Sequence, residues 1–303
     1  MNTQIIDNLR ILADYERINK EPFKVRAYEK VIDSIELYDK KIETIEDIKA
    51  LKGVGKKIED KIVEFIATGN VAEVENVIKD PKYILGIKLK GIYGVGPVKI
   101  TELMTKIKDF EELREHPELL NDKQRIGLKY YDQMNLRIPM AEGKQHYKSV
   151  KNMLDASIEF EFVGSFRRKN KDMGDIDILI KNKGGIVLKD IIKRFVDEKY
   201  VIEKLALGNN KFMGLCKLSD LPARRIDILL ADPSHYYFAL LYFTGSYNFN
   251  IYMRKVALSK GLSLSEYGFK DSKGNLMDTT DTIHSEEDIF AYLDIPYTAP
   301  HKR

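Results

Sequence analysis

The chain has 303 residues, of which 44% are hydrophobic, and its 50 Lys and Arg residues against 47 Asp and Glu leave a formal net charge of +3. These values are those of a globular protein, and they exclude a disordered chain while giving no support by themselves to nucleic-acid binding. The single cysteine excludes an intramolecular disulfide and a Cys-based zinc site. We find no signal peptide and no apolar run that could span a bilayer. An intracellular protein without a membrane partner is therefore expected.

Helical periodicity dominates the first part of the chain. Apolar residues recur at helical spacing in 5–18 and 22–38, and Pro22 favours the start of the second helix. The turn Gly53-Val54-Gly55 then precedes another apolar helix. Two glycines one residue apart permit the tight turn of a helix–hairpin–helix, and the N–H groups of the following helix can hold a phosphate.

A second turn of this kind, Gly94-Val95-Gly96, also joins apolar helices. One such turn is weak evidence, because most glycine turns bind nothing. Two turns, each followed by a lysine near a helix start, predict contacts with DNA phosphates. Lysines also concentrate at 49–61 and 88–108, and such local patches are better evidence of nucleic-acid binding than the net charge.

From about residue 155 the pattern becomes α/β. Strands are expected near 158–163, 175–180, 211–218 and 224–230, with a helix near 187–198. Cys216 is expected to be a buried strand residue. An aromatic segment at 236–245 predicts a helix leading into a turn, helices are expected at 251–258 and 288–293, and the chain is expected to fray from Tyr297 onward.

Three aspartates of the expected sheet form the strongest functional signal. Asp175 and Asp177 lie two positions apart on the strand 175–180, so their side chains point to the same side. Asp227 lies on the strand 224–230, and pairing of the two strands would bring three carboxylates together. Like charges at this proximity need a cation, and oxygen ligands without Cys or His favour Mg²⁺ over zinc. The pattern predicts two-metal phosphoryl or nucleotidyl transfer, against the alternative of an ordinary half-buried edge strand.

A glycine turn with basic residues precedes these aspartates. Gly164-Ser165 ends the strand 158–163, and the cluster Arg167-Arg168-Lys169 follows before Gly174. Exposed N–H groups, a hydroxyl and basic side chains are what a triphosphate needs beside a metal pair. Gly174 would let the backbone approach the site closely.

These blocks, in this order, resemble the family X DNA polymerases, and in their compact layout the beta-type members. The similarity extends from about Phe23 to Tyr297. The joint occurrence of the blocks is specific, whereas no block alone would be. The segments that carry the resemblance are 164–168 with 174–177, 225–227, 242–246 with Asn250 and Arg254, and 137–139.

The resemblance implies a multidomain α and α/β fold, in which helical helix–hairpin–helix domains precede a nucleotidyltransferase palm with a mixed β-sheet and a small α/β C-terminal subdomain. The expected domains are a lyase-like domain at 1–78, a DNA-binding helical subdomain at 79–138, the catalytic palm at 139–232 and a nucleotide-selection subdomain at 233–303.

The resemblance also implies roles in nucleotidyl transfer. Asp175 and Asp177 would bridge two Mg²⁺ ions, for which Mn²⁺ could substitute, and Asp227 would bind the metal beside the primer 3′-OH. The remaining implied contacts are to the triphosphate by Ser165, Arg168 and Gly174, to the sugar by Tyr242, Phe243 and Gly245, to the incoming base by Asn250, and to the template strand by Arg254 with Tyr267.

For the N-terminal domain the resemblance implies a second activity. Lys61 corresponds to the Schiff-base lysine of a 5′-deoxyribose-phosphate lyase, whose amine attacks an aldehyde when it is deprotonated. The alternative is a solvated lysine on an amphipathic helix. The residues implied to contact DNA are Lys24, Tyr28, Lys49 and Lys57 at the 5′-phosphate and Gly53, Gly55, Gly94 and Gly96 at turns that could hold monovalent cations.

Four positions depart from the family pattern. Phe23 stands in place of a histidine of the phosphate pocket, and Lys169 replaces a glycine. Tyr247 replaces an acidic residue beside the incoming base, and Ile251 replaces a lysine that rests on the template. The last two differences bear on fidelity and leave polymerisation in place.

The prediction is a gap-filling DNA polymerase of base-excision repair with an associated lyase, acting as a monomer on gapped or nicked duplex DNA and dNTPs. The alternatives are a template-independent terminal transferase, disfavoured because no long insertion separates Asp177 from Asp227, and a non-catalytic DNA-end binding scaffold, disfavoured because all three acids are present. Residence in the nucleus is expected, or in the cytoplasm or virion if the composition reflects a viral genome.

Overall fold

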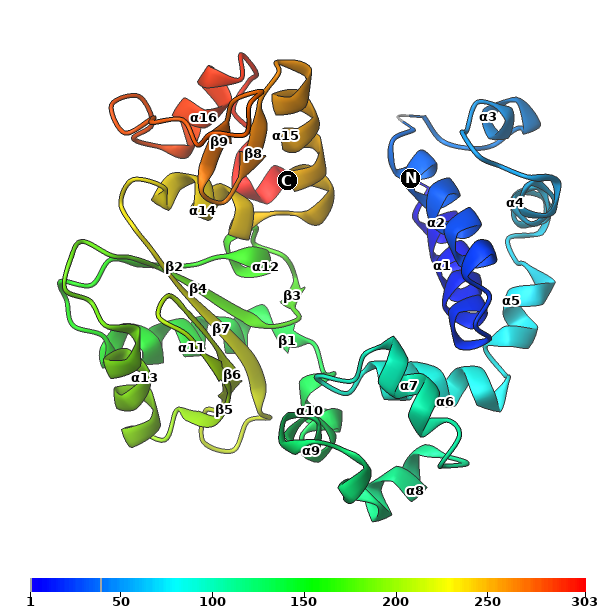
Figure 1. The fold of residues 1–303 in the computed structure, drawn as a ribbon, viewed down its shortest axis with the longest axis horizontal. Helices are drawn as coiled ribbons and strands as arrows, with labels where there is room; N and C mark the ends of the chain where they lie inside the picture. The colour runs from blue at the N-terminus through cyan, green and yellow to red at the C-terminus, as the bar shows by residue number, and fades with distance from the viewer. Residues whose placement is uncertain (1, 39) are drawn as a thin grey trace. The chain divides into compact units, whose positions relative to one another are not determined.

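The computed structural model describes residues 2–38 and 40–303, and the chain forms two compact units, Met1–Tyr131 and Asp132–Arg303 (Figure 1). The short helix α10 (Tyr131–Met134) spans the boundary between them. No helix in this described part of the chain is long and apolar enough to cross a membrane.

The first unit is entirely helical. Its helices start at recognisable signals: α3 begins with a capping box of Thr44 and Asp47, and α6 follows Asp80, whose side chain accepts from the Lys82 N–H at 2.8 Å. The elements are α1 (Thr3–Ile18), α2 (Pro22–Glu36), α3 (Ile45–Lys49), α4 (Lys56–Thr68), α5 (Ala72–Val77), α6 (Pro81–Lys90), α7 (Pro97–Leu103), α8 (Phe110–Glu115), η1 (Pro117–Leu119) and α9 (Asp122–Lys129).

Two apolar clusters hold this unit together. Leu9 and Leu12 of α1 pack with Val31 of α2 and Ile62 of α4 in the first cluster, and Leu89 of α6 belongs to the second, which α6–α9 form. The predicted helical spacing thus supplies the buried face of each helix.

The second unit is built on a mixed five-stranded sheet. Its strand order is β2-β4-β7-β6-β5, with β4 and β7 parallel and the other neighbours antiparallel. The elements are β1 (Ile138–Pro139), α11 (Met140–Met153), β2 (Phe160–Phe162), α12 (Gly164–Arg167), β3 (Asp172–Met173), β4 (Ile176–Lys181), α13 (Leu188–Asp197), β5 (Val201–Leu207), β6 (Lys211–Cys216), β7 (Arg224–Ala231), α14 (Tyr236–Thr244), α15 (Tyr247–Ser259), β8 (Ser263–Ser265), β9 (Gly268–Lys270), α16 (Glu286–Tyr292) and η2 (Pro300–Lys302).

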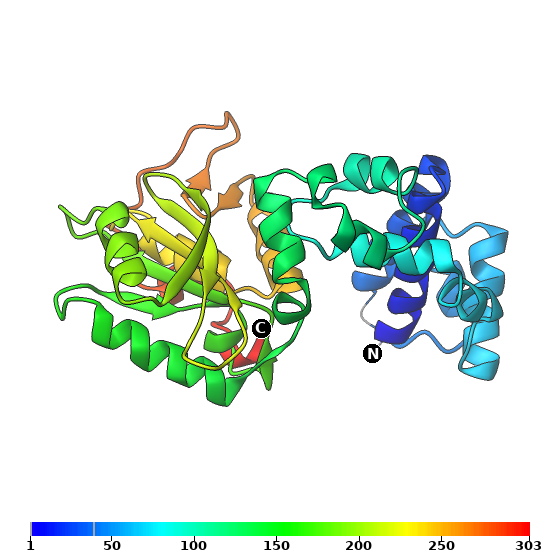
Figure 2. The same ribbon diagram turned by 90° about the horizontal axis from the view of Figure 1, so that it is seen from below.

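The two faces of the sheet pack against different helices. Alternate residues such as Ile178 of β4 and Ile228 of β7 pack with Val150 of α11 and Phe195 of α13, and Figure 2 shows these helices alongside the sheet. On the opposite face Leu179 packs with residues of α14 in a separate cluster. Strand periodicity therefore determines that Asp177 and Asp227 lie on the α14 side.

Five strands form the sheet, where the sequence pattern indicated four. The additional edge strand β5 pairs with β6 and contains two register shifts, between Val201 and Glu203 and between Lys204 and Ala206. These shifts interrupt the alternation of apolar and polar residues on which the prediction of strands depends.

The end of the chain is held in place, so the expected fraying from Tyr297 is wrong. The Arg303 side chain is 0% exposed and forms an ion pair with Glu286 of α16 at 2.7 Å. Its guanidinium lies over the rings of Phe249, Phe290 and Tyr297, at 5.3, 5.4 and 5.5 Å from their centroids. Cation–π attraction and a buried ion pair explain the order of this segment.

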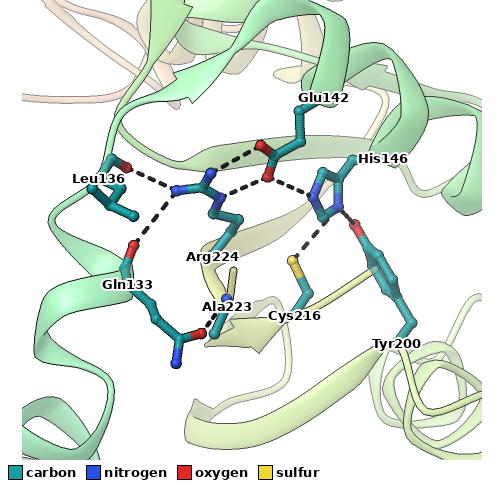
Figure 3. A network of polar contacts seen from close by, with 8 residues as sticks. All are labelled: Gln133, Leu136, Glu142, His146, Tyr200, Cys216, Ala223 and Arg224. Atoms are coloured by element: carbon teal, nitrogen blue, oxygen red, sulfur yellow. Dashed lines mark hydrogen bonds and ion pairs between the residues drawn. The ribbon is translucent and has the colours of Figure 1, made fainter. Parts of the chain in front are cut away.

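A buried polar network fastens α11 to the start of β7 (Figure 3). Arg224 donates to both Glu142 oxygens, at 2.6 and 2.9 Å, and to the Leu136 carbonyl at 3.0 Å. The Gln133 side chain accepts from the Ala223 N–H at 2.7 Å. The network therefore ties the segment that leads into the sheet unit to the strand that carries Asp227.

His146 extends the network into the core. Its Nδ1 lies 2.8 Å from the Tyr200 hydroxyl, and its Nε2 lies 3.7 Å from Glu142. Burial lowers the pKa of His146 to about 4, although Glu142 opposes the shift. Burial also raises the pKa of the Cys216 thiol to about 12, consistent with the expected buried strand cysteine.

We expect Glu142→Ala to destabilise the sheet unit by about 3–5 kcal/mol, because the substitution leaves the Arg224 guanidinium buried without its counter-charge. Urea unfolding followed by circular dichroism measures the change. Asp197→Ala is the control, since it breaks the exposed Lys193–Asp197 pair of α13 and should cost less than about 0.5 kcal/mol. Similar losses for the two variants would contradict this view of the network.

Candidate active site

The parallel pairing of β4 and β7 brings the predicted carboxylates together. Asp177 and Asp227 are direct neighbours in the register of the two strands. Asp175 lies just before β4, on the same side by strand alternation. The three predicted aspartates therefore lie together on one face of the sheet, on the neighbouring strands β4 and β7 and just before β4.

Burial of the aspartates and repulsion between their carboxylates determine the electrostatics of this site. Burial and then the neighbouring Asp175 and Asp227 carboxylates raise the pKa of Asp177 to about 7, against the opposing effects of Arg225 and Arg168. Burial likewise raises the pKa of Asp227, while Arg225 acts against the shift. The site thus holds more negative charge than its own cations neutralise.

Asp175 is engaged by an arginine of the neighbouring strand. Arg225 donates to its Oδ2 at 2.7 Å. Among residues 2–38 and 40–303, no group of three or more His, Cys, Asp or Glu side chains is arranged to hold a metal ion as it stands. The donor set itself, three carboxylates with an unneutralised charge, fits a hard dication such as Mg²⁺, which would compete with Arg225 for Asp175.

The glycine turn at 164–168 forms the short helix α12 against the carboxylates. Gly164 has φ of +55°, and a Cβ there would lie 2.5 Å from the Asp177 Oδ2. Only glycine combines this left-handed backbone with this approach. Arg168 donates to the Ser165 hydroxyl at 3.2 Å and to the Thr244 carbonyl at 2.5 Å. The structure therefore joins the two predicted triphosphate contacts to the turn after α14.

The predicted aromatic segment lies at the end of α14. The Tyr242 and Phe243 rings are perpendicular, with centroids 4.9 Å apart. Asn250 of α15 donates to the Tyr242 carbonyl at 2.8 Å, and the Arg254 guanidinium lies 5.3 Å from the Tyr242 ring centroid. Gly245 has φ of +67°, and a Cβ there would lie 3.1 Å from Arg168. These five predicted residues form one connected group with α12.

Two predicted residues lie at the margins of this group. Gly174 follows β3, and a Cβ there would lie 3.1 Å from a guanidinium nitrogen of Arg137, which itself pairs with Asp172 at 2.7 Å. Tyr267 is 58% exposed, and its ring is tilted by 59° against that of His235 with centroids 5.6 Å apart, whereas Arg254 contacts Tyr242. The joint role of Tyr267 and Arg254 stays a prediction.

The sequence analysis did not identify one support of the site. Arg167 donates to the Thr244 hydroxyl at 2.8 Å and to Glu286 at 2.5 Å, and Arg303 binds the other Glu286 oxygen. This chain of contacts connects α12 to the turn after α14 and to α16. No short motif could have indicated it, because its members lie 77 and 119 positions apart in sequence.

In the helical unit both glycine turns have the expected conformation. Gly53 and Gly94 have φ of +85° and +79°, in the left-handed region that glycine favours. Gly55 and Gly96 are the N-cap residues of α4 and α7, and no side chain caps either helix. The free N–H groups at the start of α4 are suited to a phosphate.

The predicted Schiff-base lysine lies on α4 and is mostly covered. The Lys61 side chain is 15% exposed and pairs with Glu73 of α5 at 2.8 Å. Lys24 pairs with Glu16 at 3.1 Å, and Tyr28 is buried. Burial raises the pKa of the Tyr28 hydroxyl first, and Glu73 and Glu16 raise it further, so these groups lie near one another. Lys49 and Lys57 are exposed.

Comparison with known protein families gives four matches along the chain. Residues 1–71 match a helix–hairpin–helix domain, and residues 88–135 match the fingers domain of DNA polymerase lambda. Residues 137–233 match the DNA polymerase beta palm, and residues 239–303 match the DNA polymerase beta thumb. The four matched segments follow one another along the chain without overlap.

Curated proteins from three eukaryotes are similar over the whole chain. DNA polymerase lambda of Rattus norvegicus is 29% identical over 329 residues, and DNA polymerase lambda of Arabidopsis thaliana is 27% identical over 330. The DNA polymerase type-X family protein pol4 of Schizosaccharomyces pombe is 25% identical over 326 residues. The chain spans 56%, 62% and 64% of the lengths of these relatives, respectively.

We expect Gly164→Ala to destabilise the sheet unit by about 3 kcal/mol, because the new methyl group both strains a left-handed backbone and displaces the Asp177 carboxylate. Gly185→Ala is the control, since Gly185 has φ of +74° and no atom within 4 Å of an added Cβ. It should cost about 1–2 kcal/mol, for backbone strain alone. Equal unfolding free energies in urea would show that the contact with Asp177 adds nothing.

Proposed function

Because this chain belongs to the family X DNA polymerases, we propose that it is a DNA-directed DNA polymerase that fills short gaps during base-excision repair. Its substrates are a gapped or nicked duplex and dNTPs, and the reaction joins a nucleotide to a primer 3′-OH. The observation that carries this proposal is the register that places Asp177 opposite Asp227, beside the Gly164–Ser165 turn.

Three aspartates would hold the metal ions. Asp175, Asp177 and Asp227 would hold two Mg²⁺ ions, and Mn²⁺ has the same ligand preferences. When bound, the ions lower the pKa of the 3′-OH and neutralise charge that develops on the α-phosphate. The raised pKa of Asp177 supports this assignment, because a buried, repelling carboxylate set lacks the positive charge that the ions would supply.

The surrounding residues bind and orient the nucleotide. Ser165, Arg168 and the backbone at Gly174 would contact the triphosphate, and the donors of Arg168 suit phosphate oxygens. Tyr242 and Phe243 would pack on the sugar, Asn250 would reach the base, and Arg254 with Tyr267 would contact the template strand. The contacts that link Arg168 to the Thr244 carbonyl and Asn250 to the Tyr242 carbonyl support one nucleotide pocket.

We also propose that the helical unit grips DNA and cleaves a 5′-deoxyribose phosphate. The turns at Gly53–Gly55 and Gly94–Gly96 would hold backbone phosphates, together with bound monovalent cations. Lys24, Lys49, Lys57 and Tyr28 would bind the 5′-phosphate, and the Lys61 amine would form the Schiff base. The low exposure of Lys61 favours this role over a solvated surface lysine.

Such an enzyme would act as a monomer in the compartment where its DNA is repaired. For a cellular protein this is the nucleus, and for a viral protein it is the cytoplasm or the virion. Three domain boundaries, near residues 78, 138 and 232, follow from the same assignment.

The deciding experiment uses a duplex with a one-nucleotide gap and a downstream 5′-deoxyribose phosphate. Mg²⁺-dependent incorporation of the templated dNTP would support the polymerase. Addition without regard to the template would indicate a terminal transferase, and DNA binding without incorporation would indicate a scaffold.

We expect Asp227→Ala to lower nucleotide incorporation by at least about 1000-fold, because it removes a metal ligand and leaves the phosphate contacts in place. Incorporation is measured on the gapped duplex, and binding of the same duplex by fluorescence anisotropy should be unchanged. Asp232→Ala, which alters an exposed aspartate just beyond β7, should retain activity. An active Asp227→Ala protein would overturn the assignment.

Lys61→Ala should suppress borohydride trapping of the protein on an incised abasic site, since it removes the amine that would form the Schiff base. Gap filling by the same variant should stay within about twofold of the unmodified protein, because the polymerase residues belong to the other unit. Lys79→Ala, an exposed lysine between α5 and α6, is the matched control. Full trapping by Lys61→Ala would assign the nucleophile elsewhere.

A further inference from the structure

The amine of Lys61 is held by a carboxylate from the next helix. The Glu73 Oε2 lies 2.8 Å from the Lys61 Nζ, and the Glu73 side chain is 46% exposed. The amine also lies 3.4 Å from the Lys57 carbonyl of its own helix. Of these two contacts, only the carboxylate is a base that can take up a proton during a reaction.

The turn between α4 and α5 fixes the position of Glu73. Gly69 ends α4 with φ of +77°, and Glu64 of α4 accepts from the Ala72 N–H at 2.9 Å. The buried side chains of Val71 and Val74 then anchor α5 in the core. Glu73 is therefore placed beside Lys61 by a short, hydrogen-bonded connection.

The surroundings of Lys61 contain two carboxylates, which a phosphate-binding pocket alone would not need. Glu16 pairs with Lys24 at 3.1 Å and Glu73 pairs with Lys61 at 2.8 Å, and both carboxylates raise the pKa of the buried Tyr28 hydroxyl. Carboxylates repel a phosphate and so weaken its binding. A carboxylate kept against the reactive amine therefore suggests acid–base chemistry.

We propose that Glu73 is the general base of the lyase reaction and removes the C2′ proton of the sugar after Lys61 has formed the Schiff base. The inference rests on the lyase activity proposed above for the same site. It adds a catalytic residue, from α5, to the nucleophile on α4.

The proton balance of the reaction is complete with these two residues and water. The ammonium of Lys61 loses a proton to water, and the neutral amine adds to the C1′ aldehyde. The resulting carbinolamine takes a proton from water, and its hydroxyl leaves as water to give the iminium. Glu73 then accepts the C2′ proton, and the electron pair of the C2′–H bond enters the C1′–C2′ bond as an enamine. The enamine expels the 3′ phosphate oxygen with the electrons of the C3′–O bond, and water later frees Lys61.

The geometry suits the transfer of the C2′ proton. In the Schiff base C1′ is bonded to Nζ, so C2′ lies about 2.5 Å from Nζ. A carboxylate oxygen that starts 2.8 Å from Nζ is therefore close to the C2′ proton once the amine has lost its own. The Glu16 carboxylate accepts hydrogen bonds from Lys24, at 3.1 and 3.3 Å. Glu73, which contacts Lys61 directly, is therefore better placed than Glu16 to act as the base.

Glu73→Gln tests the proposal on the gapped duplex with a 5′-deoxyribose phosphate. Two quantities are measured in parallel: the fraction of protein trapped by borohydride and the single-turnover rate of release of the sugar phosphate. We expect trapping within about twofold of the unmodified protein and release slower by at least about 100-fold. Glu75→Gln is the control, because it removes the same charge from the same helix two positions away.

Each result decides the matter. Release by Glu73→Gln at the unmodified rate, or an equal fall in trapping and release, would overturn Glu73 as the base. Slow release by Glu75→Gln as well would assign the effect to net charge and would also overturn it. Absence of trapping with the unmodified protein would instead remove the lyase activity itself, while gap filling on the same duplex would still report on the polymerase.

Discussion

The parallel register of β4 and β7 is the constraint on which the sheet unit depends. It places Asp177 opposite Asp227 and, on the same face two residues further, Leu179 opposite Leu229. The aspartates lie on this face, and the leucines beside them pack against α14. The same alternation of side chains therefore places both the charged site and the neighbouring core. Burial first, and the crowding of the carboxylates second, raise the pKa of Asp177, and Arg225 and Arg168 offset part of the shift.

Both candidate sites hold their reactive groups in internal ion pairs. Arg225 binds Asp175 beside the other two aspartates of the sheet unit, and Glu73 binds Lys61 in the helical unit. In each pair the partner opposes the charge of the reactive group and keeps it in position. A substrate or a metal ion must then replace an existing contact, which favours binding of ligands with the correct charge over others.

Local sequence patterns were sufficient for α1, α2 and the helices that follow the two glycine turns, for the strands that carry the acids, and for the turns themselves, whereas the short helices α3, α5, α8 and α9 were not predicted individually. The spacing of Asp175, Asp177 and Asp227 and the glycines at 53 and 94 predicted conformations that the structure has. The edge strand β5 escaped prediction because its register shifts break the alternation. The ion pairs of Glu286 and Glu73 could not be predicted either, because they depend on which helices pack together and no periodicity encodes that.

The burial of Cys216 makes the whole chain convenient for chemical labelling. Its side chain is 0% exposed, and burial raises the pKa of the only thiol in the sequence to about 12. The thiolate is the form that reacts with maleimides, so the natural cysteine should stay silent at neutral pH. Cysteines introduced at Lys79 and Asp232, both exposed, would then be the only reactive thiols. A pair of dyes at these positions would measure, by energy transfer, the distance between the two units with and without a gapped duplex.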